Sequence, residues 1–193
     1  MNNVARILQD QKKFEEAAGM YEQLIEVQTR VMGPENADTL MFRSNLARCY
    51  QDLKQFDKAE PQMREVVEMG KKTLTMDHLN CMIWQNNLAK LLELKGKPED
   101  AQPLYAEVVE AARKNLPETH NVRLTFELNL GGCELLLSHF DEAEPLMLNA
   151  EKQFTTILPA GHQTLKAVRT RLADMYDKMK QPDKAAEWRA KAQ

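Results

Sequence analysis

The chain has 193 residues, of which 43% are hydrophobic and 28% charged, and this composition is typical of an ordered, helical protein and not of a disordered one. Its net charge of −3 and the absence of any run of Lys or Arg exclude recognition of nucleic acid or an anionic membrane through bulk charge. No apolar run approaches the ~20 residues of a membrane span, and three cysteines without a CxxC motif indicate no disulfide framework, so we expect a cytoplasmic protein.

Five copies of one pattern, each 42 residues after the last, organise the chain. A fixed period of this size predicts a solenoid, in which each repeat buries its apolar face on its neighbours. We expect a single repeat domain over residues 1–193, with repeats near 1–42, 43–84, 85–126, 127–168 and 169–193. The aligned copies are Asn3-Val4-Ala5, Asn45-Leu46-Ala47, Asn87-Leu88-Ala89, Asn129-Leu130-Gly131 and Arg171-Leu172-Ala173, each followed twelve residues after its small residue by Ala17, Ala59, Ala101, Ala143 or Ala185.

Each repeat is predicted to be a pair of helices, because its apolar residues recur at helical spacing on both sides of a short break. The small residues of the two helices allow them to approach at the short end of the roughly 8–10 Å packing range. In the second repeat the apolar series are Leu46, Cys49, Tyr50 and Leu53, then Ala59, Met63, Val66, Val67 and Leu74.

The break between the helices carries an acidic residue in all five copies. We expect this acid to accept hydrogen bonds from free N–H groups at the start of the second helix and to favour that end of the helix dipole. Pro61, Pro103 and Pro145 are expected in the first turn, where a missing N–H costs least. The breaks in chain order are Lys12-Lys13-Phe14-Glu15, Lys54-Gln55-Phe56-Asp57, Gly96-Lys97-Pro98-Glu99, Ser138-His139-Phe140-Asp141 and Lys180-Gln181-Pro182-Asp183.

The chain resembles a tetratricopeptide repeat array over nearly its whole length. Residues of the second repeat fall on that family's large and small signature positions, namely Leu46, Ala47, Tyr50, Ala59, Met63 and Val66. The usual period of the family is about 34 residues, and the longer period found here is similar to that of kinesin light chains, as is the stretch Asn86-Asn87-Leu88-Ala89. The resemblance implies an all-α fold, a right-handed superhelical α-solenoid of about five tetratricopeptide helix pairs.

Two features qualify the resemblance. Gly131 stands where the other copies have Ala, and Arg189 stands where a large apolar residue is expected. The ending Asp183-Lys184-Ala185-Ala186-Glu187-Trp188-Arg189 also resembles arrays found in bacterial regulators and at the C-terminus of serine/threonine kinases.

In tetratricopeptide arrays the first helices line a concave groove, and the resemblance places one polar column of this chain there. An amide can both donate and accept, which suits it to grip a peptide backbone, while Arg and Lys pair with carboxylates. We therefore predict a protein-interaction scaffold whose groove binds an extended, disordered and acidic peptide of a protein partner. The predicted contacts are Asn3, Asn45, Asn87 and Asn129, with Arg6, Arg48 and Lys90 three residues further along and Arg171 at the Asn position of the last copy. Alternatively, the asparagines bond to neighbouring helices and stabilise the stack.

A second interpretation is a regulatory or self-assembly module that acts on a neighbouring domain or on a second copy of the chain. It rests on Val4, Ile7 and Leu8, whose apolar side chains have no preceding repeat to cover them in this sequence.

No enzymatic activity and no cofactor are expected, because no GxSxG, HExxH, GxxxxGK[ST] or GxGxxG motif is present. His78, His120 and His162 share one column, but equivalent residues of stacked helices lie too far apart to share a metal ion. We expect these histidines to have a role in a turn or as a helix cap, and we expect no metal site.

Overall fold

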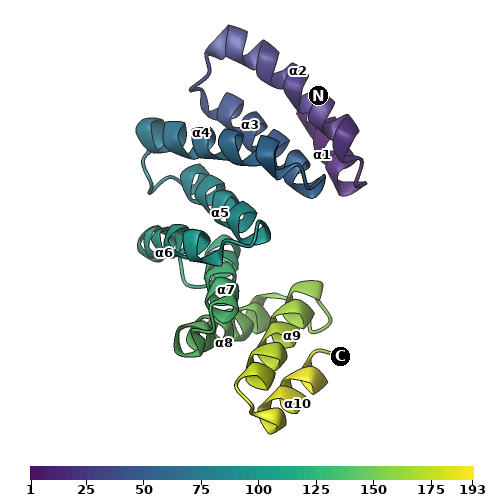
Figure 1. Cartoon of the computed structure of the whole chain (residues 1–193), viewed down its shortest axis with the longest axis vertical. Helices are drawn as coiled ribbons and strands as arrows, with labels where there is room; N and C mark the ends of the chain where they lie inside the picture. The colour runs from purple at the N-terminus through teal and green to yellow at the C-terminus, as the bar shows by residue number, and fades with distance from the viewer. The chain divides into compact units, whose positions relative to one another are not determined.

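The computed structural model describes residues 1–193 and consists of ten α-helices joined by short connections (Figure 1). No helix is both long enough and apolar enough to cross a membrane. The predicted all-α fold of five successive helix pairs is confirmed. The helices are α1 (Asn2–Asp10), α2 (Phe14–Met32), α3 (Ala37–Asp52), α4 (Phe56–Leu74), α5 (Leu79–Leu94), α6 (Pro98–Asn115), α7 (Asn121–Leu136), α8 (Phe140–Ile157), α9 (Gln163–Lys178) and α10 (Pro182–Lys191).

Two compact units divide the chain: an N-terminal unit, Met1–Lys97, with α1 to α5, and a C-terminal unit, Pro98–Gln193, with α6 to α10. Within each unit every helix packs on the next one in sequence. In addition, α3 contacts α5 in the N-terminal unit, and α7 contacts α9 in the C-terminal unit. The first helices α3 and α5, and likewise α7 and α9, are therefore direct neighbours, and side chains at equivalent positions on each pair lie beside one another.

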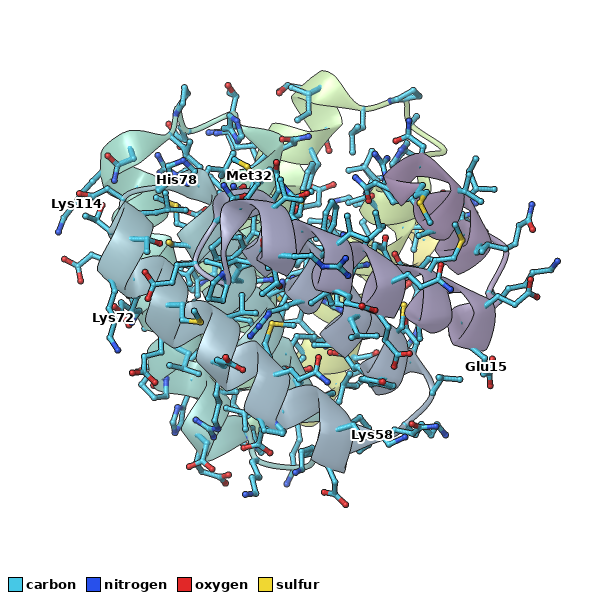
Figure 2. The ribbon with its side chains drawn as sticks, turned by 90° about the horizontal axis from the view of Figure 1, so that it is seen from above. Glu15, Met32, Lys58, Lys72, His78 and Lys114 are labelled. Carbon is cyan, nitrogen blue, oxygen red and sulfur yellow. The ribbon has the colours of Figure 1, made fainter.

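The small residues of the repeat lie where the helices meet, as predicted. Around them lie larger side chains such as Tyr21 and Leu46 in the N-terminal unit and Met147 and Leu172 in the C-terminal unit. Charged side chains of the second helices extend outward instead, as Figure 2 shows for Glu15, Lys58 and Lys72. The buried small residues are Ala5, Ala17, Ala47, Ala59, Ala89, Ala101, Ala143, Ala173 and Ala185.

Each first helix ends in the same turn, because one residue adopts a left-handed backbone conformation in all five repeats. The next residue then donates its N–H to the carbonyl five residues back, as Gln55 does to Tyr50 at 2.8 Å, which is the hydrogen bond of a Schellman motif. Only the third repeat uses glycine, the residue that adopts this conformation without steric cost. The left-handed residues are Lys12, Lys54, Gly96, Ser138 and Lys180.

The second helices begin differently from the prediction. Their acidic residues lie in the first turn, where the helix dipole favours them, but none of them caps the helix: Gln55 and His139 are the N-cap residues of α4 and α8 and make no side-chain cap bond. Because α4, α6 and α8 already begin at Phe56, Pro98 and Phe140, the three prolines expected in the first turn lie beyond it: Pro61, Pro103 and Pro145. The carbonyl that Pro61 leaves without an N–H partner is that of Asp57, an exposed residue whose carbonyl water can reach.

The histidine column caps the first helices, as predicted. Nδ1 of His78, His120 and His162 accepts a hydrogen bond from the backbone N–H two residues further on, at 3.2, 3.3 and 3.2 Å. The prediction missed Asn36, which occupies the same column and caps α3 through a 3.0 Å bond from the N–H of Asp38. All four side chains satisfy N–H groups that a helix start leaves free.

Candidate functional site

The N-terminal unit contains three of the four predicted asparagines, one on each first helix. Asn45 and Asn87 lie on the contacting helices α3 and α5 and are half-buried, whereas Asn3 on α1 is exposed. None of these three amides takes part in a hydrogen bond within the chain. They form a row of amide groups whose donors and acceptors are available to another molecule.

The predicted cations accompany these asparagines in the same unit. Arg6 and Arg48 are exposed, and Lys90 is half-buried with its Nζ 2.5 Å from Oε1 of Glu93 on the same helix. Both arginines lie close to Tyr21: burial raises the pKa of this phenol to about 12, and the positive charges of Arg48 and Arg6 act in the opposite direction. The arginines of α1 and α3 therefore flank one tyrosine, whose hydroxyl donates to Oε1 of Gln9 at 2.9 Å.

Two carboxylates that the sequence analysis missed share this helix face. Asp10 and Asp52 each follow an arginine of the row by four residues, which places them one helical turn further along. Burial raises the pKa of Asp52, and the Arg48 guanidinium partly offsets that effect. The row is thus cationic next to the asparagines and acidic at the C-terminal ends of α1 and α3. The i,i+4 spacing of these carboxylates from the arginines would have been enough to predict their place on this helix face.

The C-terminal unit holds the other two predicted residues, Asn129 on α7 and Arg171 on α9, both half-buried. Asn129 already has a polar partner in the chain. A Cβ built on Gly132 would lie 3.5 Å from Nη1 of Arg171. Since Gly132 occupies the position of Arg6, Arg48 and Lys90, the guanidinium of Arg171 lies where the earlier repeats carry their own cation.

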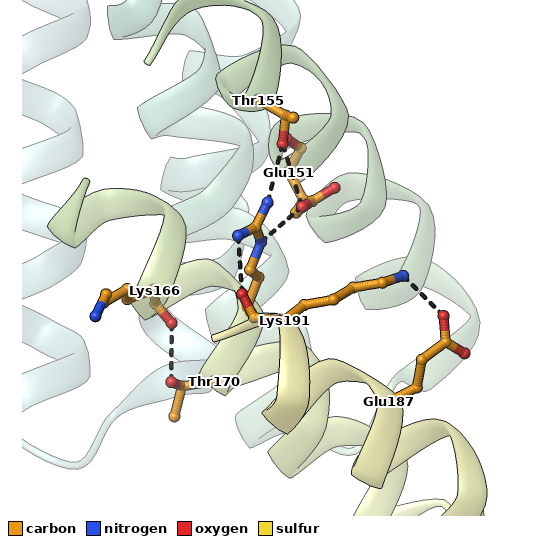
Figure 3. Close-up of polar contacts among 7 residues, drawn as sticks. Glu151, Thr155, Lys166, Thr170, Glu187 and Lys191 are labelled. Atoms are coloured by element: carbon orange, nitrogen blue, oxygen red, sulfur yellow. Dashed lines mark hydrogen bonds and ion pairs between the residues drawn. The ribbon is translucent and has the colours of Figure 1, made fainter. Parts of the chain in front are cut away.

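A second polar layer, absent from the prediction, lies two residues before the asparagine column. Arg43 of α3 pairs through Nη1 with Oε1 of Glu65 at 2.7 Å. Glu127 of α7 is fully buried and accepts hydrogen bonds from α6 and α8. Arg169 of α9 donates to Glu151 Oε1 at 2.8 Å, to the carbonyl oxygen of Lys191 at 2.8 Å and to Thr155 (Figure 3). One sequence pattern could have revealed this layer: charged residues recur at the repeat period, next to apolar positions.

No three His, Cys, Asp or Glu side chains converge in a way that could hold a metal ion. The three cysteines, Cys49, Cys81 and Cys133, are buried and form no disulfide bond. The chemistry of the exposed row is therefore that of hydrogen bonding and ion pairing.

Helix pairs stacked in series, with polar rows on the first helices, define a scaffold for protein–protein interaction. The family model of the tetratricopeptide repeat matches residues 1–72 and 41–114, so the chain belongs to the tetratricopeptide repeat family. No curated protein matches it.

Solved structures specify the type of repeat. Nearly identical TPR-like repeats assigned to a kinesin light chain of Podosopora anserina give a TM-score of 0.84 at 25% identity, over 99% of this chain and 90% of that one. BtubC (BKLC) from P. vanneervenii gives 0.82 at 20% identity, over 97% and 75%. A Rap protein complexed with Competence and Sporulation Factor gives 0.77 at 20% identity, over 97% and 51%. The repeats are of the kinesin-light-chain-like type.

Proposed function

We propose that the chain binds an extended peptide segment of a partner protein along its first helices, with Asn45 and Asn87 holding the peptide backbone. The observation that supports this most is that both amides lie at equivalent places on contacting helices, are partly exposed and have no hydrogen-bond partner in the chain. Amides spaced along neighbouring helices can bond to successive peptide groups of an extended chain, whatever its side chains are.

The charges of the same row favour an acidic segment. Arg6 and Arg48 are exposed and take part in no ion pair, so a carboxylate of the ligand can bind there without displacing an internal partner. Asp10 and Asp52 would repel such a ligand at the helix ends, which places its acidic residues beside the asparagines. A disordered segment suits this role because its backbone groups are free to bond. We place this activity in the cytoplasm, a reducing compartment that suits three cysteines without a disulfide bond.

The test is the combined substitution Asn45→Ala and Asn87→Ala. A pool of fluorescein-labelled twelve-residue acidic peptides would be screened by fluorescence polarisation, and the tightest binder titrated. Each lost hydrogen bond contributes about 1 kcal/mol, so we expect the dissociation constant of the double variant to rise by about 30-fold.

The matched control replaces amides of the second helices, Gln23→Ala with Gln62→Ala, and should leave the dissociation constant unchanged. Arg48→Glu should weaken the acidic peptide further without affecting an uncharged one. Undiminished binding by the asparagine double variant would remove these residues from the site.

A second candidate is self-association through an apolar face of α1 and α2. Val4 and Ile7 of α1 are 49% and 53% exposed, whereas the equivalent side chains of α3 and α5 are buried by helix packing. Val27, Val31 and Met32 of α2 are also largely exposed. Exposed apolar area of this kind is typical of an interaction surface.

Sedimentation velocity tests this candidate. We expect the wild type to shift from monomer to dimer as its concentration rises to the hundred-micromolar range, and Val4→Glu with Ile7→Glu to keep the chain monomeric. A wild type that stays monomeric at every concentration would eliminate self-association as the function.

A further inference from the structure

The C-terminal unit has a groove whose lining differs from that of the asparagine row. It encloses about 590 Å³ between α6 and α8, with α7 as its floor. Glu127, Leu130 and Glu134 form the floor, and Pro145 and Leu146 of α8 form an apolar wall. Asn129 is two residues from Glu127 and so lies about 200° around α7. The groove and Asn129 therefore occupy different faces of α7.

The floor of the groove is where the fourth repeat departs most from its sister copies. In the other four repeats the position of Glu127 is Met, Arg, Gln and Arg, and the position of Glu134 is Leu, Tyr, Leu and Tyr. Both carboxylates are buried, although acids are rarely found inside proteins unless they are paired. The sequence of α7 has thus brought two negative charges to a position that is neutral or positive elsewhere in the chain.

Gly131, the third departure on α7, positions the apolar wall. A Cβ at this residue would lie 3.1 Å from Cγ of Met147 and 3.3 Å from Cβ of Leu146. The alanine of the other repeats would therefore push Leu146 from its place. The bare glycine lets α8 rest close to α7 and holds Leu146 beside the carboxylates.

The arginines of the groove are occupied by one of these acids. Oε1 of Glu127 accepts from Nε of Arg113 at 2.9 Å and from Nε of Arg123 at 3.4 Å, and Oε2 accepts from Nδ2 of Asn149 at 2.8 Å. Two guanidinium groups thus face one carboxylate. The groove is also lined by Glu118 and Glu142, which are exposed and form no ion pair.

Glu134 connects this groove to a second cavity. Its Oε1 accepts from Nε2 of Gln102 at 2.8 Å, and its Oε2 lies 2.9 Å from Nδ1 of His139. Gln102 and His139 line a neighbouring cavity of about 500 Å³, together with Glu99 and Leu137. Two adjoining cavities extend the site along α7 beyond the size of one side chain, which suits a segment of polypeptide.

The lining has four glutamates against two arginines, and the apolar wall lies beside the acids. Charge complementarity selects a ligand that is positively charged, and the wall selects one with an apolar side chain next to the charge. We propose that this groove binds a basic peptide segment, with a Lys or Arg directed at the exposed Glu118 and Glu142 and an adjacent Leu- or Val-like side chain on Leu130 and Leu146. The scaffold then has one peptide site in each compact unit, with opposite charge preferences.

The test uses the full chain and two labelled twelve-residue peptides that share their apolar residues and carry either three Lys or three Glu at the same positions. By fluorescence polarisation we expect the Lys peptide to bind at least tenfold more tightly than the Glu peptide. Glu118→Gln with Glu142→Gln should weaken the Lys peptide at least tenfold. Both residues are exposed, so this variant should fold normally.

The control removes the same charge outside the groove, through Glu110→Gln and Asp141→Asn on α6 and α8, and should change the affinity less than twofold. A photoreactive residue in the Lys peptide should cross-link to residues 142–149. Saturation with an acidic peptide should not displace the Lys peptide. Binding at the groove is therefore tested independently of binding at the asparagine row. Any of three results would overturn the proposal. They are no binding of the Lys peptide, an equal loss of affinity in the control variant, and cross-links confined to α9 and α10.

Discussion

Replacement of Glu127 by Ala should destabilise the C-terminal unit by about 3 kcal/mol, the lower end of the cost of removing one partner from a buried ion pair. Glu127 is fully buried, and its loss leaves the amide of Asn149 without its acceptor and the guanidinium of Arg123 without a counter-charge, bonded only to the carbonyl oxygen of Leu116. The Arg123 side chain is only 15% exposed and cannot turn to water, whereas that of Arg113 is 51% exposed and can. Because only one of the two guanidinium groups stays buried, we expect the destabilisation by Glu127→Ala to be at the lower end of the range for buried ion pairs.

Urea denaturation followed by circular dichroism measures the effect, and hydrogen exchange of the α7 amides locates it. Arg113→Ala is the informative comparison: it breaks the same ion pair from its exposed side and should cost less than about 1 kcal/mol. Glu127→Gln should fall between the two, because it keeps the shape and one acceptor. Similar stabilities for Glu127→Ala and Arg113→Ala would show that burial does not control this cluster.

Replacement of Gly70 by Ala should destabilise the N-terminal unit by about 1–3 kcal/mol, even though alanine is the better helix former. A Cβ at Gly70 would lie 2.8 Å from two carbons of the Trp84 ring, a distance that real Cβ atoms do not tolerate. The indole is rigid and nearly fully buried, so it cannot move away without displacing its own neighbours.

Gly19→Ala provides the matched control, because Gly19 also lies inside a second helix but has no heavy atom within 4 Å of its added Cβ. We expect it to stabilise the protein by about 0.5–1 kcal/mol through helix propensity alone. Thermal unfolding of both variants measures the contrast. A rise in melting temperature for Gly70→Ala would contradict the close packing of α4 on α5.

The repeat register could be predicted from sequence because it depends on local spacing. Ala47 and Ala101 lie buried between helices, as the repeat period indicated. His120 caps α7, as its position at the end of the link between two repeats indicated. Asn45 and Asn87 could also be placed on neighbouring first helices in this way. What these asparagines bind stays a prediction.

Side-chain partners between repeats could not be predicted, since they depend on distances that the period does not contain. Glu127 looks like an exposed acid in the sequence, yet it meets Arg113 and Asn149 from helices on either side. The acidic residue in the break between the two helices of each repeat was predicted to cap the second helix. The structure lacks this bond, because the turn places the acidic residue inside the second helix and not before it. Pro61 was misplaced for the same reason.

The Gly70–Trp84 contact also indicates how such an array can change over time. Fourteen residues separate this pair, and the residues at the same spacing in the other repeats differ in size: Gln28 and Phe42, Ala112 and Phe126, and Phe154 and Val168. Excision of residues 71–112 would preserve the period but set Gly70 opposite Phe126, leaving a hollow that the indole had filled. The side chains that meet between two successive repeats therefore fit each other at each junction. If repeats were duplicated, lost or shuffled, the two sides of a junction would have to change together.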